Sequence, residues 1–327
     1  MVKRLKKTLK QFPGKNVIVW GDIILDEYIF TSTRRISREA PVLVTEFESN
    51  EYKLGGAGNV VMNLKSLGAN PVPLCFLGKD TDADVLKTLL AKNHIKTEFL
   101  IELEEYRTPK KSRILSGGEN TKKQQILRID TFNKKFIASS KYKLIEKHLI
   151  NLLEDIDLLI ISDYLYKSVQ PKIFNLIRKQ FPSRIIIIDS RNHLLNFKQT
   201  TIATPNEPEL KKMFPDVNFE EEEDYYQAGK NLQARLQARG LLLKRGHKGM
   251  ITFESNKKTQ IIDIYGGTEI VDGTGAGDTV IAVTSLAYLT GADLATSAQL
   301  ASIASGMVVM KEGAYPISFN ELFSLLN

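Results

Sequence analysis

A glycine-rich turn that carries a carboxylate is the segment of this chain that points most directly to chemistry. Residues 271–278 read Val-Asp-Gly-Thr-Gly-Ala-Gly-Asp, and an apolar run that favours a helix follows at 279–289. Glycines let backbone N–H groups approach an anion, and the first turn of a helix adds the positive end of its dipole. Asp278 lies in that same turn. The segment therefore predicts an anion site with a fixed base, which is what phosphoryl transfer to a hydroxyl requires.

Taken alone, this turn also fits a tight connection in which Asp278 is an ordinary acidic residue of a first helical turn. It is not a Walker A loop, because no Gly-Lys-Ser/Thr follows its glycines. It is not the dinucleotide-binding fingerprint either, because it lies near the C-terminus and not in a first βα turn. The surrounding helices and strands are therefore needed to distinguish an anion-binding site from a simple connection.

Apolar strands alternate with helical patterns in the second half of the chain. The predicted strands are residues 157–162, 184–189, 201–204, 241–244 and 250–254, and the predicted helices are residues 172–179, a segment opening after Pro205-Asn206, and 224–239. The first half adds a strand at 16–20, a helix at 58–67 and a strand at 72–77. Continuous apolar strands separated by helices are typical of a parallel sheet covered on both faces, so the expected fold class is α/β.

Two segments break this alternation. Residues 42–53 and 111–129 read as extended, partly alternating strands with no crossover helix after them. We expect a small antiparallel sheet that acts as a lid, built from about residues 35–53 and 104–130 and inserted in a single domain that spans residues 1–327.

Polar residues stand where predicted strands end. In an open α/β sheet, ligands bind beyond the C-terminal ends of the strands. The residues at these ends are Gly21-Asp22, Ser162-Asp163, Asp189-Ser190-Arg191, Pro205-Asn206 and Lys244-Arg245-Gly246. Each pair or triplet alone fits a cap or a turn, but together they favour a binding site.

Composition excludes several classes of function. The chain has 327 residues, a net charge of +7 and 25% charged residues, which is ordinary for a globular protein. No basic stripe interleaved with aromatic residues is present, so we expect no nucleic-acid partner. No apolar run reaches membrane-spanning length and no secretory signal opens the chain, so we expect no membrane partner and a cytoplasmic location. A single cysteine, Cys75, fits a reducing compartment, and the scattered histidines give no metal-ligand cluster.

Three motifs together resemble those of the ribokinase-like (PfkB) carbohydrate kinase family. They are Gly55-Gly56-Ala57-Gly58-Asn59 followed by Gly68 and Gly78, Asn206-Glu207-Pro208-Glu209, and the segment 272–278. Their order and separation agree with the family's signatures, and the resemblance covers nearly the whole chain. It implies a ribokinase-like fold, with a mostly parallel central sheet, helices on both faces and a small antiparallel β lid.

Within that family, the chain most resembles the kinase domain of heptose 7-phosphate kinases. The segments that carry this resemblance are residues 21–28, 35–42, Gln124-Gln125 with 128–130, and Ser162-Asp163-Tyr164. Leu165 and Lys167 depart from the pattern, because glycine is usual at both positions. In many members the kinase is fused to a nucleotidyltransferase domain. This chain has no His-x-Gly-His motif, so we expect a stand-alone kinase.

The resemblance assigns roles to the glycine-rich turn. It implies that Asp278 is the general base that takes the proton of the acceptor hydroxyl. It implies further that Gly275, Ala276 and Gly277 form the anion hole for the transferring phosphoryl group.

The resemblance also implies two cofactors, ATP and Mg²⁺, and leaves a monovalent-cation requirement open. Asn206 and Glu209 would orient water and phosphate on the metal, so Glu209 would act on Mg²⁺ through water. From the residues alone, Asn206 also fits a helix N-cap, and Glu209 would then complete a capping box. The residues expected on the nucleotide side are Asn206, Glu209, Lys244, Arg245, Gly246, Thr274 and Ser302.

A second group of residues is expected to bind the acceptor. Sugar hydroxyls would be held by Asp22, Asp26, Gly55, Gly56 and Asn59, although Asp26 fits a turn residue equally well. An acceptor that already carries a phosphate needs cations, and the predicted lid offers Lys111, Arg113 and Arg128. The alternative for these three is ordinary surface charge. Arg191 fits a contact with either the substrate or the nucleotide phosphates.

The expected function is ATP-dependent phosphorylation of a sugar phosphate, with heptose 7-phosphate converted to the 1,7-bisphosphate. One alternative is a kinase of another sugar or of a nucleoside. Another is a catalytically silent regulator that binds a sugar or a nucleotide. The resemblance also implies a homodimer formed through the lid, since an exposed sheet edge invites pairing.

Overall fold

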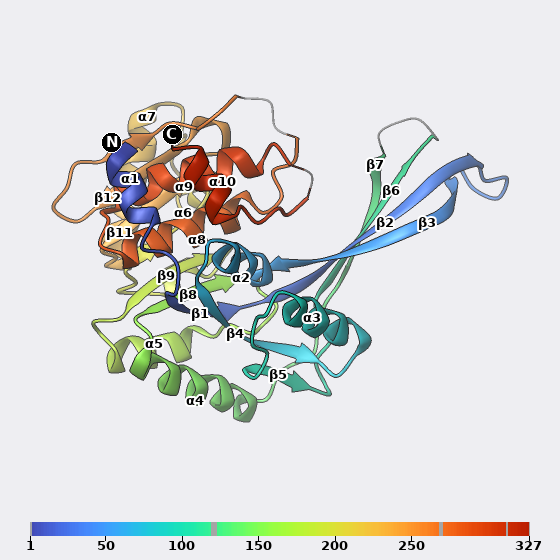
Figure 1. The fold of residues 1–327 in the computed structure, drawn as a ribbon, viewed down its shortest axis with the longest axis horizontal. Helices are drawn as coiled ribbons and strands as arrows, with labels where there is room; N and C mark the ends of the chain where they lie inside the picture. The colour runs from blue at the N-terminus through green and yellow to red at the C-terminus, as the bar shows by residue number, and fades with distance from the viewer. Residues whose placement is uncertain (1, 119–122, 268–270, 312, 327) are drawn as a thin grey trace.

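A nine-stranded sheet forms the centre of the molecule in the computed structural model, which describes residues 2–118, 123–267, 271–311 and 313–326 (Figure 1). The strands lie in the order β13-β12-β11-β10-β9-β8-β1-β4-β5. Their bounds are β1 (Asn16–Gly21), β4 (Asn70–Gly78), β5 (Leu100–Leu103), β8 (Leu158–Asp163), β9 (Ile185–Ser190), β10 (Ile202–Ala203), β11 (Gly240–Lys244), β12 (Met250–Glu254) and β13 (Gln260–Ile262). All neighbours from β11 to β5 are parallel, and only the pairs β11–β12 and β12–β13 are antiparallel. The expected mostly parallel sheet is confirmed.

Helices cover both faces of this sheet, as expected (Figure 1). Val17 and Val19 of β1 pack into one layer, and the alternate residues Ile18 and Trp20 pack into the other. The first layer contains α1 (Val2–Leu9), α2 (Ala57–Ser66), α3 (Thr81–Lys92), α8 (Ala276–Leu289), α9 (Leu294–Val308) and α10 (Phe319–Ser324). The second layer contains α4 (Ser139–Asp155), α5 (Pro171–Gln180), α6 (Glu207–Met213) and α7 (Glu222–Leu236). Burial on both faces is the reason that the strands read as continuous apolar runs.

The predicted strands and helices of the body agree closely with the observed ones. The largest difference is the helix predicted at 224–239, which is α7 and begins and ends earlier. Glu221 and Asp224 form a capping box at its N-terminus, and Gln237 adopts a left-handed φ of 52° that ends it. Two short 3₁₀ helices, η1 (Leu194–Asn196) and η2 (Gly246–Lys248), follow β9 and β11. In the described part of the chain, no helix is long and apolar enough to cross a membrane.

The lid is a separate four-stranded sheet that projects from the body as a blade (Figure 1). Its order is β3-β2-β6-β7, with bounds β2 (Ile23–Ile36), β3 (Leu43–Gly56), β6 (Lys110–Gly117) and β7 (Gln124–Thr131). The outer pairs are antiparallel, as expected, and the central pair β2 and β6 is parallel. Residues 119–122 of the predicted lid segment lie outside the described residues.

The strand β2 extends the lid beyond the predicted segments. It leaves β1 after Asp22 and runs 14 residues from the body to the tip of the blade. Its first residues are buried and its last four are exposed, so its sequence has no single alternating period. The lid is therefore continuous with the strand end that carries Asp22.

Candidate active site

The N-terminus of α8 has the conformation that the glycine-rich turn predicts. Gly275 is the N-cap residue and has a φ of 83°, which glycine adopts without strain. A Cβ at Gly275 would lie 2.4 Å from Nδ2 of Asn59, so no larger residue fits. The first N–H groups of a helix lack intrahelical partners, and that of Ala276 makes only a 3.3 Å bond to the Gly273 carbonyl. The turn from Gly275 to Gly277 therefore offers donors and the positive end of the helix dipole to an anion.

The carboxylate of Asp278 is buried in the first turn of α8 and accepts two side-chain hydrogen bonds. Asn59 Nδ2 donates to Oδ2 at 2.9 Å, and the Tyr164 hydroxyl donates to Oδ1 at 2.9 Å. Burial raises the pKa of Asp278 from 3.8 to about 6, although both hydrogen bonds favour the charged form. A carboxylate with this pKa is ionised at neutral pH and accepts a proton more readily than an exposed one.

Asn59 is held in place by its own partners. Asn63 Nδ2 donates to the Asn59 carbonyl at 2.9 Å and to its Oδ1 at 3.3 Å. Thr279 Oγ1 in turn donates to Asn63 Oδ1 at 3.1 Å. Because its Oδ1 accepts from Asn63, the amide of Asn59 presents Nδ2 to Asp278. Sequence reasoning assigned Asn59 to sugar hydroxyls and missed Asn63, whose only signal is its place one helical turn after the Gly-Asn motif.

Asp22 is bonded to the loop that follows β8. Its side chain is 1% exposed, and both of its oxygens accept backbone hydrogen bonds from the loop after β8. The N–H groups of Tyr164 and Tyr166 donate to Oδ2 and that of Ser168 donates to Oδ1, each at 2.9 Å. Burial, with a smaller contribution from Asp163, raises the pKa of Asp22 to about 6. Asp22 therefore holds this loop in place, and its predicted contact with sugar hydroxyls stays a prediction.

Asp26 faces the lid and is paired with a cation. Arg113 Nη1 donates to Asp26 Oδ1 at 2.7 Å, and Asp26 is 4% exposed. A Cβ at Gly55 would lie 2.1 Å from Asp26 Oδ2, so the glycine makes room for the carboxylate. Gly56 has a φ of 57°, and a Cβ there would lie 2.6 Å from the Asp22 carbonyl. The two glycines of the motif therefore shape the junction between lid and body.

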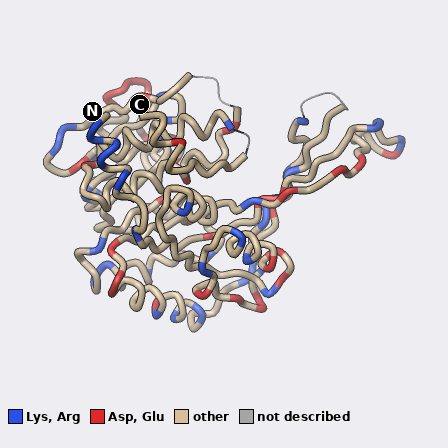
Figure 2. Tube along the Cα trace, in the orientation of Figure 1, with Lys and Arg blue, Asp and Glu red and all other residues tan. Residues whose placement is uncertain are grey.

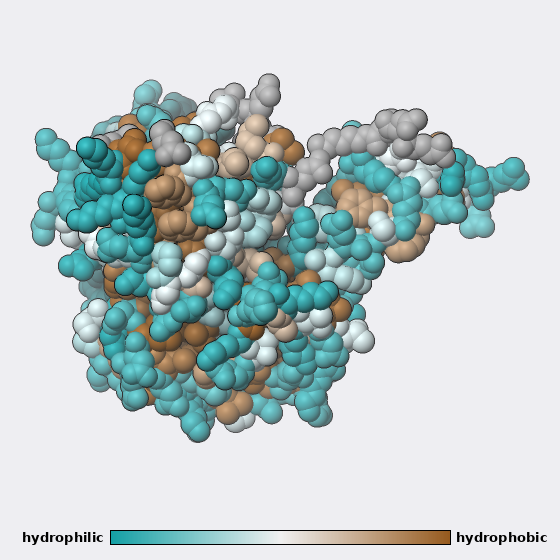
Figure 3. Space-filling view, viewed as in Figure 1, coloured by the Kyte–Doolittle hydropathy of each residue, from teal (hydrophilic) through white to brown (hydrophobic). Residues whose placement is uncertain are grey.

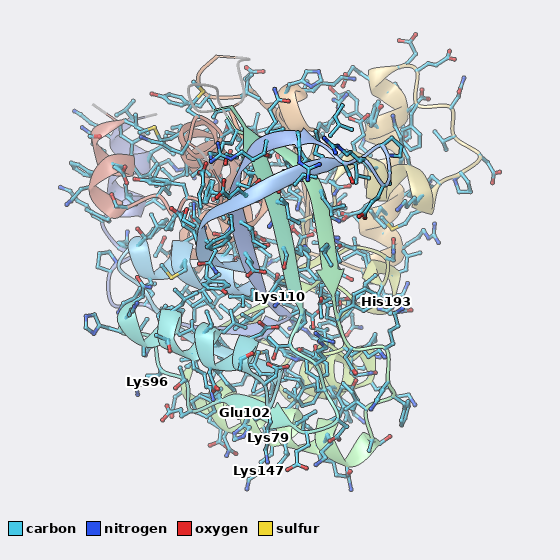
Figure 4. The ribbon with its side chains drawn as sticks, turned by 90° about the vertical axis from the view of Figure 1, so that its right-hand side faces the viewer. Lys79, Lys96, Glu102, Lys110, Lys147 and His193 are labelled. Atoms are coloured by element: carbon cyan, nitrogen blue, oxygen red, sulfur yellow. The ribbon has the colours of Figure 1, made fainter. Side chains whose placement is uncertain are left out.

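Three cations converge on this junction, and we call Lys111, Arg113 and Arg191 the acceptor-side cations. Lys111 Nζ lies 5.3 Å and Arg191 Cζ 4.5 Å from the centre of the Tyr164 ring. Burial lowers the pKa of Lys111, and the charges of Arg191 and Arg113 lower it further against the opposing charge of Asp26. In Figure 2, charged residues of both signs gather where the lid strands leave the body. Figure 4 looks onto this end of the molecule, with Lys110 at the start of β6 and His193 in the loop after β9 labelled.

Arg128, the third predicted lid cation, differs from the acceptor-side cations in its exposure and its pairing, and its predicted contact with the acceptor stays a prediction. It lies opposite Arg113 in the register of β6 and β7. Its guanidinium makes two bonds to Asp130, at 2.8 and 2.9 Å, and its side chain is half exposed. The structure brings Lys111 and Arg113 together with Arg191, whose sequence signal was its place directly after a strand.

A cavity of about 690 Å³ opens beside the N-terminus of α8, and none of the acceptor-side cations lines it. Its lining includes Asn206, Lys244, Arg245, Gly246, Ala276, Gly277 and Ser302 from the predicted sites, with the apolar residues Met250, Ile264, Val280 and Val309. A volume of this size, with polar groups at one part of an apolar wall, is typical of a small-molecule site. Most of the residues predicted on the nucleotide side therefore share one cavity with the anion hole.

Lys244 brings a positive charge close to the anion hole. Its Nζ lies 2.5 Å from Asp189 Oδ2 and would lie 3.6 Å from a Cβ at Gly277. Thr274 does not line the cavity, and its N–H donates to Asp272 Oδ1 at 2.8 Å to shape the turn. Lys244 thus lies beside the first turn of α8, and Thr274 supports the loop that leads into this turn.

The remaining residues predicted on the nucleotide side form the cavity wall. The guanidinium of Arg245 makes two bonds to Glu222, at 2.5 and 2.8 Å, so its charge is largely neutralised. Ser302 Oγ donates to the Asp263 carbonyl at 2.7 Å. Gly246 has a φ of 56° and leaves open space beside it.

Asn206 and Glu209 form the capping box of α6. The Glu209 N–H donates to Asn206 Oδ1 at 2.8 Å, and the Asn206 N–H donates to Glu209 Oε2 at 2.9 Å. Burial, with the negative charge of Asp189, raises the pKa of Glu209 to about 7. The capping reading is confirmed, and the role in binding magnesium stays a prediction. Among the described residues, no group of three or more acidic, histidine or cysteine side chains is arranged to hold a metal.

Comparison with known proteins agrees with this geometry. Residues 15–320 match the family described as pfkB family carbohydrate kinase. The chain is 33% identical over 308 residues to the bifunctional protein HldE of Citrifermentans bemidjiense, covering 93% of this chain and 62% of that protein. It is 35% identical over 316 residues to HldE of Haemophilus influenzae, covering 95% of this chain and 63% of that protein. The chain thus spans less than two thirds of the length of these curated relatives.

Solved structures show the same fold at lower identity. A ribokinase of Arabidopsis thaliana complexed with ribose and ATP superposes with a TM-score of 0.73 at 17% identity, covering 96% of this chain and 99% of that one. Phosphofructokinase-2 of Escherichia coli superposes with a TM-score of 0.77 at 16% identity, covering 96% of this chain and 98% of that one. The expected ribokinase-like fold is confirmed. With its signature motifs gathered around one buried aspartate and residues 15–320 matched by the family, the chain belongs to the pfkB family of carbohydrate kinases.

Proposed function

We propose that this chain transfers the γ-phosphoryl group of ATP to a hydroxyl of heptose 7-phosphate, giving the 1,7-bisphosphate. The observation that carries the proposal is the cluster of acceptor-side cations next to Asp278 and away from the lining of the nucleotide cavity. Like charges held together at a protein surface favour an anionic ligand. An acceptor that already carries a phosphate would supply that anion.

In the proposed reaction, Asp278 takes the proton of the acceptor hydroxyl as its oxygen attacks the γ-phosphorus. The bond between that phosphorus and the bridging oxygen breaks, and ADP leaves. The N–H groups of Gly275, Ala276 and Gly277, with the charge of Lys244, would stabilise the negative charge on the transferring group. A positioned base is worth ~10²–10⁴-fold in rate.

The nucleotide side would hold ATP together with Mg²⁺. The metal, when bound, neutralises charge on the nucleotide phosphates, and it prefers phosphate, water and one or two carboxylates as ligands. The residues fit this preference, because Glu209 and Asp189 place two carboxylates close enough for Asp189 to add to the rise that burial produces in the pKa of Glu209. A cation nearby would relieve that repulsion. We assign to these two residues the task of orienting metal-bound water.

The acceptor phosphate would lie among the acceptor-side cations. Arg113 is held by Asp26, so its orientation is fixed before any ligand arrives. Lys111 and Arg191 lie over the Tyr164 ring, which orients them without neutralising their charge. Sugar hydroxyls would then reach Asp26 and Asp278, two buried carboxylates near this junction.

The alternative functions fit these observations less well. A nucleoside or a free sugar carries no anion to match the acceptor-side cations. A silent regulator does not need a buried carboxylate with a raised pKa, yet Asp278 and the turn from Gly275 to Gly277 are intact. Because the reaction consumes cellular ATP, we assign the protein to the cytoplasm.

We also propose that the chain forms a homodimer through the lid. The edge strands β3 and β7 expose large apolar side chains, and Figure 3 shows apolar side chains on the blade among hydrophilic ones. These residues are Leu43, Phe47, Ile126, Leu127 and Ile129. Light scattering after gel filtration tests this, and a monomer at micromolar concentration would contradict it.

An ATP-consumption assay with matched acceptors tests the main proposal. Heptose 7-phosphate and the unphosphorylated heptose differ only in the group that the acceptor-side cations would bind. We expect kcat/KM to favour the phosphorylated sugar by about ten- to a hundred-fold per charge-assisted contact. Equal kcat/KM for the two sugars would contradict the proposal and favour a free-sugar kinase.

A further inference from the structure

Tyr164 connects the acceptor-side cations to the catalytic base, and no role described so far explains its placement. Its half-buried ring lies beneath Lys111 and Arg191, and its hydroxyl donates to Asp278 Oδ1 at 2.9 Å. The two residues come from different elements that are 114 positions apart in the sequence. A phenol needs no acidic partner to be buried, so this hydrogen bond calls for an explanation.

The loop that carries Tyr164 has an unusual backbone. Leu165 has a φ of 69° and Lys167 a φ of 79°, a left-handed region that side chains other than glycine rarely adopt. Strain of this kind persists only where the surroundings hold it in place, and it often marks functional sites. Here Asp22 accepts three N–H groups of the loop, and Asp163 Oδ1 accepts the N–H of Leu165 at 3.0 Å.

We propose that Tyr164 is a positioning residue for the base: its hydroxyl orients the carboxylate of Asp278 and keeps it ionised, and Asp22 anchors the loop that delivers this hydroxyl. The proposal rests on the proposed function, in which Asp278 is the base. It also gives a role to the three backbone hydrogen bonds that Asp22 accepts, which is to fix the loop that carries Tyr164.

The charges around Asp278 support this role. Asn59 of α2 and Tyr164 are its two hydrogen-bond donors, Lys244 of β11 favours its charged form, and Asp189 of β9 opposes it. Burial and the nearby carboxylate of Asp278 raise the pKa of Tyr164 well above its usual 10. The phenol therefore stays protonated at every working pH and remains a donor to the base.

The position of Tyr164 also links the cations that would bind the acceptor phosphate to the base that would act on the acceptor hydroxyl. A phosphate bound by Lys111 and Arg191 would lie against the ring whose hydroxyl holds the base. Orientation of the acceptor and orientation of the base would then depend on one side chain. This is the type of pre-organisation by which a site gains rate without new contacts to the substrate.

The pH dependence of turnover tests the proposal. Tyr164→Phe removes the hydroxyl and keeps the ring under the cations. Loss of a hydrogen bond to a charged group should move the acid limb of kcat/KM for the acceptor to higher pH by about one pH unit. Tyr166→Phe is the matched control, because it makes the same deletion in the same loop on a hydroxyl that does not bond Asp278. An unmoved acid limb in Tyr164→Phe, or an equal shift in the control, would overturn the proposal.

A second measurement does not depend on the acceptor. Carbon-detected NMR of the full chain, with Asp278→Asn to identify the resonance, follows the titration of the Asp278 carboxyl with no substrate present. We expect this titration to move upward in Tyr164→Phe and to stay in place in Tyr166→Phe, and equal titrations would refute the role. If heptose 7-phosphate were not the acceptor, wild-type turnover would stay at background while this titration still shifted.

Discussion

The two sides of Asp278 are built in different ways. On the nucleotide side, the cation next to the anion hole already has a partner, because Lys244 bonds Asp189. On the acceptor side, Lys111 and Arg191 lie over an aromatic ring, and among the described residues neither forms an ion pair. The cation beside the anion hole is therefore already paired, whereas two cations of the acceptor side, Lys111 and Arg191, are not.

This difference indicates where specificity lies. A nucleotide site made of backbone N–H groups, glycines and an apolar wall recognises features that all ATP-dependent kinases share. Unpaired cations lower the stability of the fold unless a bound anion neutralises their charge, so a protein keeps them where function needs them. The acceptor side, which joins the lid to the body, should therefore decide which sugar is phosphorylated.

The largest expected effect comes from the residue between the two sides. Asp278→Asn keeps the shape of the side chain and removes the base, so we expect kcat to fall by at least ~10²-fold. The new amide is compatible with its surroundings, because the Tyr164 hydroxyl can accept where it donated before. Binding of ATP, measured by calorimetry, should be preserved. Turnover close to that of the wild type would remove Asp278 from its role.

The same variant should be more stable than the wild type at neutral pH. Burial raises the pKa of Asp278 to about 6 in the folded protein, so the folded state binds this proton more tightly than the unfolded chain. The wild type therefore loses stability as the pH rises from about 4 to 6, and Asp278→Asn does not. We expect the variant to gain on the order of 2 kcal/mol at pH 7, with no gain below pH 4. Thermal melts at the two pH values check this, and an equal difference at both would contradict it.

The next largest effect concerns the acceptor-side cations. Arg191→Ala should raise the KM of the phosphorylated acceptor about ten- to a hundred-fold and leave the KM of ATP nearly unchanged. Arg128→Ala is the matched control, because that arginine is bound by Asp130 and lies outside the cluster. Arg113→Ala is less clean, since it would also leave Asp26 buried without its partner. If Arg128→Ala raised the KM of the phosphorylated acceptor as much as Arg191→Ala, our choice of the acceptor-side cations would be wrong.

The contrast between the two sides also explains what could be predicted from the sequence. The glycine-rich turn is local: Gly275 and Asp278 belong to one turn, and glycine with a following apolar run is enough to predict that a helix begins there. Capping of α6 by Asn206 and Glu209 is equally local, and the structure contains it. The body strands were predictable because burial on both faces leaves continuous apolar runs.

The acceptor side could not be predicted in the same way, because it depends on topology. Lys111, Arg191 and Tyr164 come from β6, the loop after β9 and the loop after β8, and only the strand order brings them together. Arg128 has the right residue type on a neighbouring strand, yet Asp130 takes its guanidinium. No pattern in the sequence predicts the hydrogen bond from Tyr164 to Asp278.

A smaller effect is expected from the nucleotide side. Glu209→Gln keeps an oxygen that can accept from the Asn206 N–H, so the cap should survive while the charge is lost. We expect the Mg²⁺ concentration for half-maximal activity to rise several-fold with little change in melting temperature. Asn206→Ala is the contrasting variant, because it removes the cap and should cost ~1 kcal/mol of stability. Unchanged Mg²⁺ titrations in both variants would leave only the capping role.

The smallest expected effect is in the loop that joins the two sides. Leu165 adopts a φ of 69°, which costs a residue with a Cβ roughly 1–2 kcal/mol, whereas glycine loses only about 0.5–1 kcal/mol through its freer unfolded chain. Leu165→Gly should therefore stabilise the fold by up to about 1 kcal/mol. Leu195→Gly is the control, because that leucine is half-buried with an ordinary backbone, so it loses packing and pays the glycine cost with no strain to relieve. A melting temperature lowered equally by both would show that packing, and not strain, governs the loop. A higher melting temperature in Leu165→Gly would show that the chain keeps a less stable backbone where Tyr164 has to reach the base.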